Sequence, residues 1–156
     1  MNFNIYLFSL LNIFVLILSK QIWKSLTPLV RMGCYLLSVI FIYDWVSIAG
    51  NSANIMELPV DWNVSILFIV NRLVLLPLTV VLFLELFLQR QNKSTQIVTW
   101  LVGVAVVACL DYSNSWLEII HYQHWNITRA LFLWLCFSIF FYGGYRFFGY
   151  LEKKGS

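Results

Sequence analysis

Charged residues are scarce in this chain of 156 residues: 11% are Asp, Glu, Lys or Arg, while 61% are hydrophobic. Soluble globular domains carry about 25% charged residues, so this chain has too few polar groups to cover a water-exposed surface. The low charge excludes a soluble domain and predicts an all-α integral membrane helical bundle. It also excludes a nucleic-acid-binding surface, which needs clustered cations.

Cysteine is also rare, and Cys34, Cys109 and Cys136 show no CxxC spacing. They indicate neither a disulfide framework nor a redox pair, and we interpret them as packing residues. The GxSG serine elbow, a glycine-rich phosphate loop and a paired acidic metal motif are missing too. These absences favour a protein that has no cofactor and performs no covalent chemistry. A membrane enzyme that acts on lipid or quinone stays open as an alternative.

Long apolar runs make up most of the sequence. Because a bilayer core needs about 20 apolar residues per helix, the hydrophobic pattern predicts five transmembrane helices in one membrane domain, residues 1–156. We expect them at 3–19, 28–49, 64–88, 97–116 and 127–148. No cationic stretch precedes the first run and no small-residue cleavage site follows it, so it is interpreted as a retained helix and not as a signal peptide.

Cations gather at alternate helix ends, as the positive-inside rule requires of cytoplasmic ends. The connections at 51–61 and 117–125 have none. The pattern places the N-terminus outside and the C-terminus inside. The cations of the inner ends are Lys20, Lys24, Arg31, Arg90, Lys93, Arg146, Lys153 and Lys154. Aromatic belts agree, with Trp45, Trp62, Trp116 and Trp125 at the outer boundary and Trp23 and Trp100 at the inner one.

The second and third helices form a hairpin that resembles the one formed by the fourth and fifth. Each hairpin enters its second helix with a Trp-Asn pair, in WNVS at 62–65 and WNIT at 125–128. Asn63 and Asn126 can each cap the backbone N–H groups of the helix that follows. The likeness indicates either an internal duplication or the shared needs of two outer hairpin tips in a tryptophan-rich chain.

Of the charged residues in the predicted helices, four form the short list of charges inside the bilayer, where an unpaired charge is costly. At a rise of ~1.5 Å per residue, Arg72 lies roughly 12 Å below the outer end of its helix, and Asp44 and Asp111 lie about 8 Å below theirs. These three residues therefore share one outer-leaflet layer. The fourth, Glu85, is near the inner boundary, where we expect it to reach water or to pair with a nearby cation such as Arg90.

Two functions fit this outer layer. In the one we favour, Arg72 forms a dry structural bridge to Asp44 and Asp111 that ties the hairpins together. The remaining hydrogen bonds would come from Asn71 and from Tyr43 or Tyr112. In the other, the layer opens outward and binds a cation, a proton or a small solute for transport. A water-accessible cavity that reaches Arg72 would distinguish the second function from the first.

Glu118, His121 and His124 would form the rim of the open site. Their i, i+3, i+6 spacing would place them on one face of a helix, and two histidines with a carboxylate are plausible zinc ligands. The HExxH pattern of zinc proteases is missing, however, and hydrogen bonding at the membrane interface explains these residues without a metal. We therefore predict no metal site.

The third helix contains the run LLPLTVVLFL at 75–84, in which Pro77 predicts a kink. This run and the entry HYQHWN at 121–126, followed by an aromatic helix and a basic tail, resemble a functionally uncharacterised family of small multispanning membrane proteins from spore-forming Gram-positive bacteria. The resemblance implies a helical bundle in the bacterial plasma membrane and supplies no catalytic residue. Where that family usually has Gly-Trp-Asn, this chain has His124-Trp125-Asn126, so no role of His124 follows from it.

These observations predict a non-catalytic accessory or interaction protein. Its expected partners are the lipid bilayer and another membrane protein or a second copy of the chain. A small-solute or ion transporter, or the substrate-binding subunit of one, is the main alternative.

Overall fold

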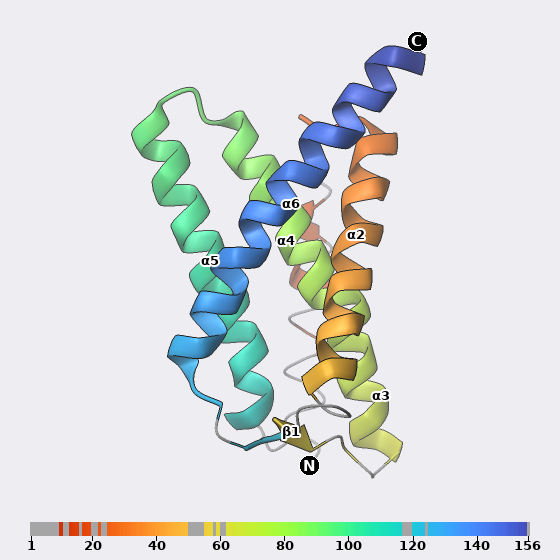
Figure 1. Ribbon diagram of the computed structural model, residues 1–156, viewed down its shortest axis with the longest axis vertical. Helices are drawn as coiled ribbons and strands as arrows, with labels where there is room; N and C mark the ends of the chain where they lie inside the picture. Colours follow the sequence, from red (N-terminus) through yellow and green to blue (C-terminus); the bar gives the residue numbers. More distant parts are fainter. Residues whose placement is uncertain are drawn as a thin grey trace.

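The computed structural model in Figure 1 is an all-α bundle, which confirms the predicted fold class. The structure describes residues 10, 13–15, 17–19, 22, 25–49, 55–57, 59, 62–116, 120–123 and 125–155. Within them, four helical segments are long and apolar enough to cross a membrane: Pro28–Ser47, Val64–Gln89, Lys93–Ser115 and Ile127–Lys154. The chain therefore has the architecture of a multi-pass membrane protein. Most of the first predicted helix, 3–19, lies outside the described residues.

The helices follow the predicted order. They are α2 (Pro28–Ser47), α3 (Trp62–Val70) continued by the π-helical turn η2 (Asn71–Leu75) and by α4 (Leu76–Gln89), α5 (Lys93–Trp116) and α6 (Ile127–Gly155). Two-residue strands, β1 (Met56–Glu57) and β2 (His121–Tyr122), lie at the tips of the two hairpins. The third predicted helix is thus α3, η2 and α4 in sequence.

Local capping explains several helix boundaries. Pro28 begins α2 in the first-turn position predicted for it, and the Thr27 hydroxyl accepts a hydrogen bond from the Val30 N–H. The Asn126 side chain accepts from the Arg129 N–H at 3.0 Å, which confirms its predicted cap. Helix α5 begins four residues before the predicted 97 because the Asn92 side chain accepts from the Ser94 N–H and supports the polar first turn.

The helices form a ring in which α2 contacts α4 and α6, and α5 also contacts α4 and α6. Consecutive helices run in opposite directions, so every neighbouring pair is antiparallel (Figure 1). The α4–α5 connection and the end of α6 lie at one end of the bundle with the start of α2, and β1 lies at the other. The predicted cationic ends therefore gather at a single end of the molecule.

The two hairpin tips are related by a local two-fold. Ile55 donates its N–H to the Ala49 carbonyl, and Ile120 donates to the Asn114 carbonyl, so each tip has a bond across six residues. A strand follows each bond, and β1 pairs with β2 in an antiparallel register of Met56 with Tyr122 and Glu57 with His121. Residues 56 and 57 of the first tip correspond to residues 121 and 122 of the second, 65 positions later. Exchanging the two tips therefore converts one pair into the other, as a two-fold requires. The tips thus support the predicted similarity of the hairpins.

The helix that contains α3, η2 and α4 is the most buried one. Of its apolar window, 56% is buried, against 22–28% in the other three candidate spans. Each neighbouring helix contributes one stripe at the three- and four-residue spacing of a single helical face. These stripes are Val30, Cys34, Ser38 and Ile42 on α2, Val104, Val107, Ala108 and Asp111 on α5, and Ala130, Trp134, Phe137 and Phe141 on α6.

Glycine allows α2 and α6 to approach each other closely. A Cβ atom at Gly33 would lie 3.1 Å from the Phe148 ring, and a Cβ atom at Gly144 would collide with the Leu37 side chain. Small residues allow this kind of backbone approach in membrane bundles. The two positions lie toward the cationic end, so α6 is drawn against α2 there.

The π-helical turn lies just before Pro77, and the proline leaves one backbone carbonyl of this turn without its helical N–H donor. Proline has no N–H to donate to the carbonyl one turn earlier, that of Leu73. The Tyr35 hydroxyl of α2 donates to the Leu73 carbonyl instead, at 2.6 Å. Neighbouring side chains often satisfy carbonyls that proline frees in membrane helices. Tyr35 thus fixes α2 against the point where α4 begins.

This pairing predicts the effect of Tyr35→Phe. The change leaves the Leu73 carbonyl without its donor and should lower the unfolding free energy by about 1 kcal/mol, a common value for hydrogen bonds between membrane helices. Tyr43→Phe on the same helix is the control, because Tyr43 is 69% exposed. Denaturant unfolding in mixed micelles measures both changes. In a Pro77→Ala background, where an N–H is restored, Tyr35→Phe should cost less; an equal cost in both backgrounds would contradict this pairing.

Candidate functional site

A buried ion pair joins η2 to α5 in the outer half of the bundle. The Arg72 Nη2 atom lies 2.6 Å from Asp111 Oδ1, and the side chains are 5% and 1% exposed. Removing one partner from such a buried pair leaves an uncompensated charge and costs about 3–5 kcal/mol. The predicted contact between Arg72 and Asp111 is confirmed.

The Asp111 carboxylate accepts hydrogen bonds from two further side chains. The Tyr122 hydroxyl of β2 donates to Oδ1 at 3.1 Å, and the Trp134 indole of α6 donates to Oδ2 at 3.0 Å. Tyr122 also accepts from Arg72 Nη2 at 3.1 Å. One carboxylate on α5 therefore holds η2, the tip strand β2 and α6 together.

Tyr122 is outside the candidate spans, and its environment keeps its phenol protonated. Burial raises the pKa of Tyr122 above its ordinary value, and the neighbouring Asp111 carboxylate raises this pKa further, against the lowering effect of Arg72. The hydroxyl thus stays a donor to Asp111 across the physiological pH range.

A second polar contact lies beside the ion pair. Asn71, which precedes Arg72 in the π-helical turn, donates from its side-chain amide to Asn114 Oδ1 at 2.5 Å. Both asparagines are fully buried, and Asn114 donates in turn to the Leu110 and Asp111 carbonyls of its own helix. The π-helical turn therefore presents two consecutive polar residues to α5, and such turns often occur at functional sites.

Asp44 does not belong to this layer, so the prediction of a bridge to Asp44 is wrong. Asp44 is exposed and forms no ion pair with Arg72. It follows Ile42, the last residue of the buried α2 stripe, by two positions, which is about 200° around a helix. The depth of Asp44 was consistent with the layer, but its direction is opposite.

The aromatic partners also differ from the expected ones. Tyr43 is 69% exposed and does not contribute. Tyr112 stacks on Tyr122 with ring centroids 6.4 Å apart and 4° between the planes, so it supports the tyrosine that bonds Asp111. Glu118, His124 and the His121 side chain lie outside the described residues. Within the described part of the chain, no group of His, Cys, Asp and Glu could hold a metal.

The outer layer is buried, but, contrary to our expectation, it is not fully paired. Among the described residues, the Arg72 Nε and Nη1 atoms and the Trp45 and Trp125 indole nitrogens find no hydrogen-bond partner. The two indoles contact each other at 4.9 Å between centroids, and Trp125 contacts Tyr122. The guanidinium also lies 5.4 Å from the centre of the Phe68 ring, where a cation–π attraction offsets part of the deficit.

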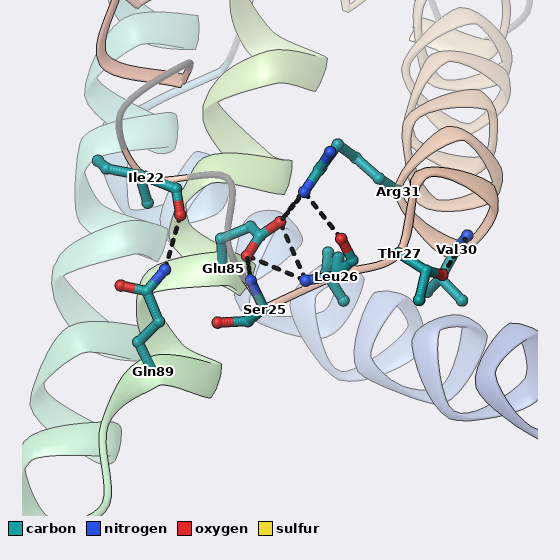
Figure 2. A network of polar contacts seen from close by, with 8 residues as sticks. All are labelled: Ile22, Ser25, Leu26, Thr27, Val30, Arg31, Glu85 and Gln89. Atoms are coloured by element: carbon teal, nitrogen blue, oxygen red, sulfur yellow. Dashed lines mark hydrogen bonds and ion pairs between the residues drawn. The ribbon is translucent and has the colours of Figure 1, made fainter.

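Glu85 forms the second buried ion pair, near the cationic end (Figure 2). The Arg31 Nη2 atom of α2 lies 2.8 Å from Glu85 Oε1, and the Glu85 side chain is fully buried. The Ser25 and Leu26 backbone N–H groups donate to Oε2 at 2.8 and 3.2 Å. Arg31 also donates to the Leu26 carbonyl at 2.8 Å. The carboxylate thus organises the backbone that enters α2.

Gln89 reinforces the same contact. It lies one turn after Glu85 on α4 and donates to the Ile22 carbonyl at 2.7 Å, as Figure 2 shows. The last turn of α4 therefore binds the chain before α2 at two points, Ile22 and the Ser25–Leu26 pair. The described residues between the first and second predicted helices are thus held against the bundle.

Of the two alternatives predicted for Glu85, pairing with a nearby cation is confirmed, and exposure to water is wrong because the side chain is fully buried. The partner is Arg31 and not the Arg90 named as an example, which is exposed. Counting residues from the helix ends, which predicted the outer layer, also predicts this pair. Glu85 lies four residues from the end of α4 and Arg31 three residues from the start of α2, about 5–6 Å along each axis.

Comparisons of the chain with protein-family models, with curated proteins and with solved structures find no match. The resemblance to a family from spore-forming bacteria therefore stays a prediction. Function must be inferred from the ion pairs, the cavity and the surface of the chain itself.

The outer ion pair predicts a large effect of Arg72→Met. This change leaves the Asp111 carboxylate buried without its cation and should lower the unfolding free energy by about 3–5 kcal/mol. Asp44→Asn should change it by less than about 0.5 kcal/mol, since Asp44 is exposed. Yield in membranes and denaturant unfolding in micelles measure both. Normal accumulation and stability of Arg72→Met would show that the bridge is not needed.

The inner ion pair predicts that Glu85→Gln loosens the entry to α2. The neutral amide weakens the bonds to Arg31 and to the two N–H groups, each worth about 1.5–3 kcal/mol when one partner is charged. Hydrogen exchange at the Ser25 and Leu26 amides should become at least tenfold faster. Arg90→Gln, which removes the partner expected from sequence, should leave both amides protected. Equal protection in wild type and Glu85→Gln would contradict the assignment.

Proposed function

We propose that this multi-pass membrane protein is a non-catalytic accessory or interaction protein of a bacterial cytoplasmic membrane. One observation carries the proposal: both ion pairs join segments of the bundle, and the side chains of Arg72, Asp111 and Glu85 are at most 5% exposed. A buried charge that is paired inside the bundle acts as a packing element. The outer layer thus serves as a structural bridge.

The surface of the bundle supports a role in contacts within the membrane. Large apolar side chains cover the outward faces of α2 and α6, where Leu29, Met32, Phe132 and Ile139 are 61–69% exposed. Such faces are stable against lipid tails or against another transmembrane helix. The partners we propose are the lipid bilayer and either another membrane protein or a second copy.

The grouping of cations supports the proposed orientation. Arg90, Lys93, Arg146, Lys153 and Lys154 lie in the segments that share one end of the bundle. By the positive-inside rule this end is cytoplasmic, which places the C-terminus inside and the hairpin tips outside.

A small-solute or ion transporter is the second candidate, and the unpaired donors of Arg72 favour it. Within the described part of the chain, two guanidinium nitrogens of Arg72 and the Trp45 and Trp125 indole nitrogens have no hydrogen-bond partner, and such buried donors could receive a polar solute. However, the cavity that opens between α4, α5 and α6 is apolar, and Arg72 does not line it. A membrane enzyme that uses Glu118 or His121 is the third candidate, and the side chains it needs lie outside the described residues.

Thiol labelling distinguishes the structural bridge from an open site. In a background with Cys34, Cys109 and Cys136 replaced by alanine, single cysteines at Arg72, Asp111 and Asn114 should resist a membrane-impermeant maleimide applied from outside. Asn114→Cys keeps the ion pair intact and is therefore the decisive variant. A cysteine at the exposed Gln123 is the positive control. Fast labelling at position 114 would support the transporter and contradict the sealed bridge.

A further inference from the structure

A cavity of about 270 Å³ lies between α4, α5 and α6 within the candidate spans. Its walls are almost entirely carbon, and its lining residues include Phe83 and Phe87 on α4, Trp100 and Val104 on α5, and Phe137 and Tyr142 on α6. Lining residues Ile139 and Tyr142 are 61% and 39% exposed, so the cavity opens on the outer surface of the bundle. In a membrane, this surface faces lipid chains.

The path of α6 explains why the space exists. Figure 1 shows α6 crossing the bundle obliquely, from α5 near the hairpin tips toward α2 at the cationic end. The close contacts of Gly144 with Leu37 and of Gly33 with Phe148 hold α6 against α2 there. Because α6 leaves α5 in this direction, the space between them is filled by aromatic side chains only in part.

The size and chemistry of the cavity restrict its occupant. A volume of 270 Å³ corresponds to about nine water molecules in the liquid. Apolar walls offer water no hydrogen bonds, and such cavities stay dry. A transmembrane helix is about 10 Å across and too wide to enter. A hydrocarbon chain from the bilayer fits both limits.

Cations lie beyond the inner end of this cavity. The Phe87 and Tyr142 rings contact each other at 5.8 Å between centroids. Arg90 follows Phe87 by three residues, Arg146 follows Tyr142 by one helical turn, and Lys93 precedes Trp100 by two turns on the same face of α5. All three cations are exposed, and none forms an ion pair with a described residue.

We propose that this cavity binds one acyl chain of an anionic phospholipid, whose phosphate lies against Arg90, Lys93 and Arg146. The apolar walls match the chain, and the unpaired cations match the phosphate. Anionic lipids are enriched in the cytoplasmic leaflet, and cations near their headgroups bind them. The site would thus recognise the lipid by charge as well as by shape. The proposal rests on the membrane placement of the chain and not on an accessory role.

Native mass spectrometry of the full chain tests the proposal. The protein is released from micelles that contain equal amounts of dioleoyl phosphatidylglycerol and dioleoyl phosphatidylcholine. Wild type should retain one phosphatidylglycerol per chain, with at least about tenfold preference. Arg146→Gln should weaken retention about fivefold, the effect of one cation near an anionic headgroup. Lys154→Gln, which removes a cation from the same helix eight residues farther on, should retain lipid as wild type does.

A second pair of variants tests the cavity itself. Ser138 lines it, and its hydroxyl donates to the Leu135 carbonyl of its own helix, so its replacement breaks no hydrogen bond between helices. Ser138→Phe should fill the space and abolish retention of the lipid. Cys136→Phe is the control, because Cys136 is exposed on the same helix and lies outside the cavity. If Ser138→Phe does not fold, Ser138→Leu should still lower retention by at least fivefold.

Three results would overturn the proposal. Equal retention of phosphatidylcholine and phosphatidylglycerol by wild type would remove the role of the cations. Retention unchanged in a folded Ser138→Phe or Ser138→Leu variant would place the lipid elsewhere. A lipid-free dimer of wild type that Ser138→Phe separates would show that a second copy covers the cavity.

Discussion

The charge of Arg72 is the constraint on which the outer half of this bundle depends. A guanidinium among membrane helices is stable only with a partner, and Asp111 supplies it from α5 at 2.6 Å. The carboxylate in turn holds the Tyr122 hydroxyl at the hairpin tip and the Trp134 indole on α6. Because these groups come from segments far apart in the sequence, one ion pair determines how the two hairpins meet.

The same central helix is held again near its cationic end, where Glu85 receives Arg31 and two backbone N–H groups. Two ion pairs at different depths of one helix favour a rigid scaffold over a bundle that alternates between conformations. A function of such a scaffold would then depend on its surface, namely on the exposed apolar faces and the apolar cavity. Trp134 connects the Arg72–Asp111 pair with the apolar cavity. Its indole donates to Asp111, and it also lines the cavity where we propose that a lipid chain binds.

The all-α fold and the Arg72–Asp111 contact were predictable from the sequence. Hydropathy reveals the membrane-spanning helices, and counting residues along each helix gives the depth of a charged residue in the membrane. The sequence did not predict which way a side chain points. Asp44 had the right depth but lies opposite the buried stripe that ends at Ile42, and this stripe becomes visible once the neighbours of α2 are known. Tyr122 could not be predicted as a partner, since a strand at a hairpin tip brings it back over the membrane helices. The Glu85–Arg31 pair was within reach of the same depth argument, but Arg31 had been grouped with the loop cations.

A double-mutant cycle on Arg72 and Asp111 tests the central claim most directly. The unfolding free energies of wild type, Arg72→Met, Asp111→Leu and the double variant would be measured in the same micelles. If the pair is a sealed structural bridge, the double variant should be more stable than either single variant, because no unpaired charge is left buried. Coupling between the two positions should then exceed about 2 kcal/mol. Additive effects of the two single changes would contradict the account.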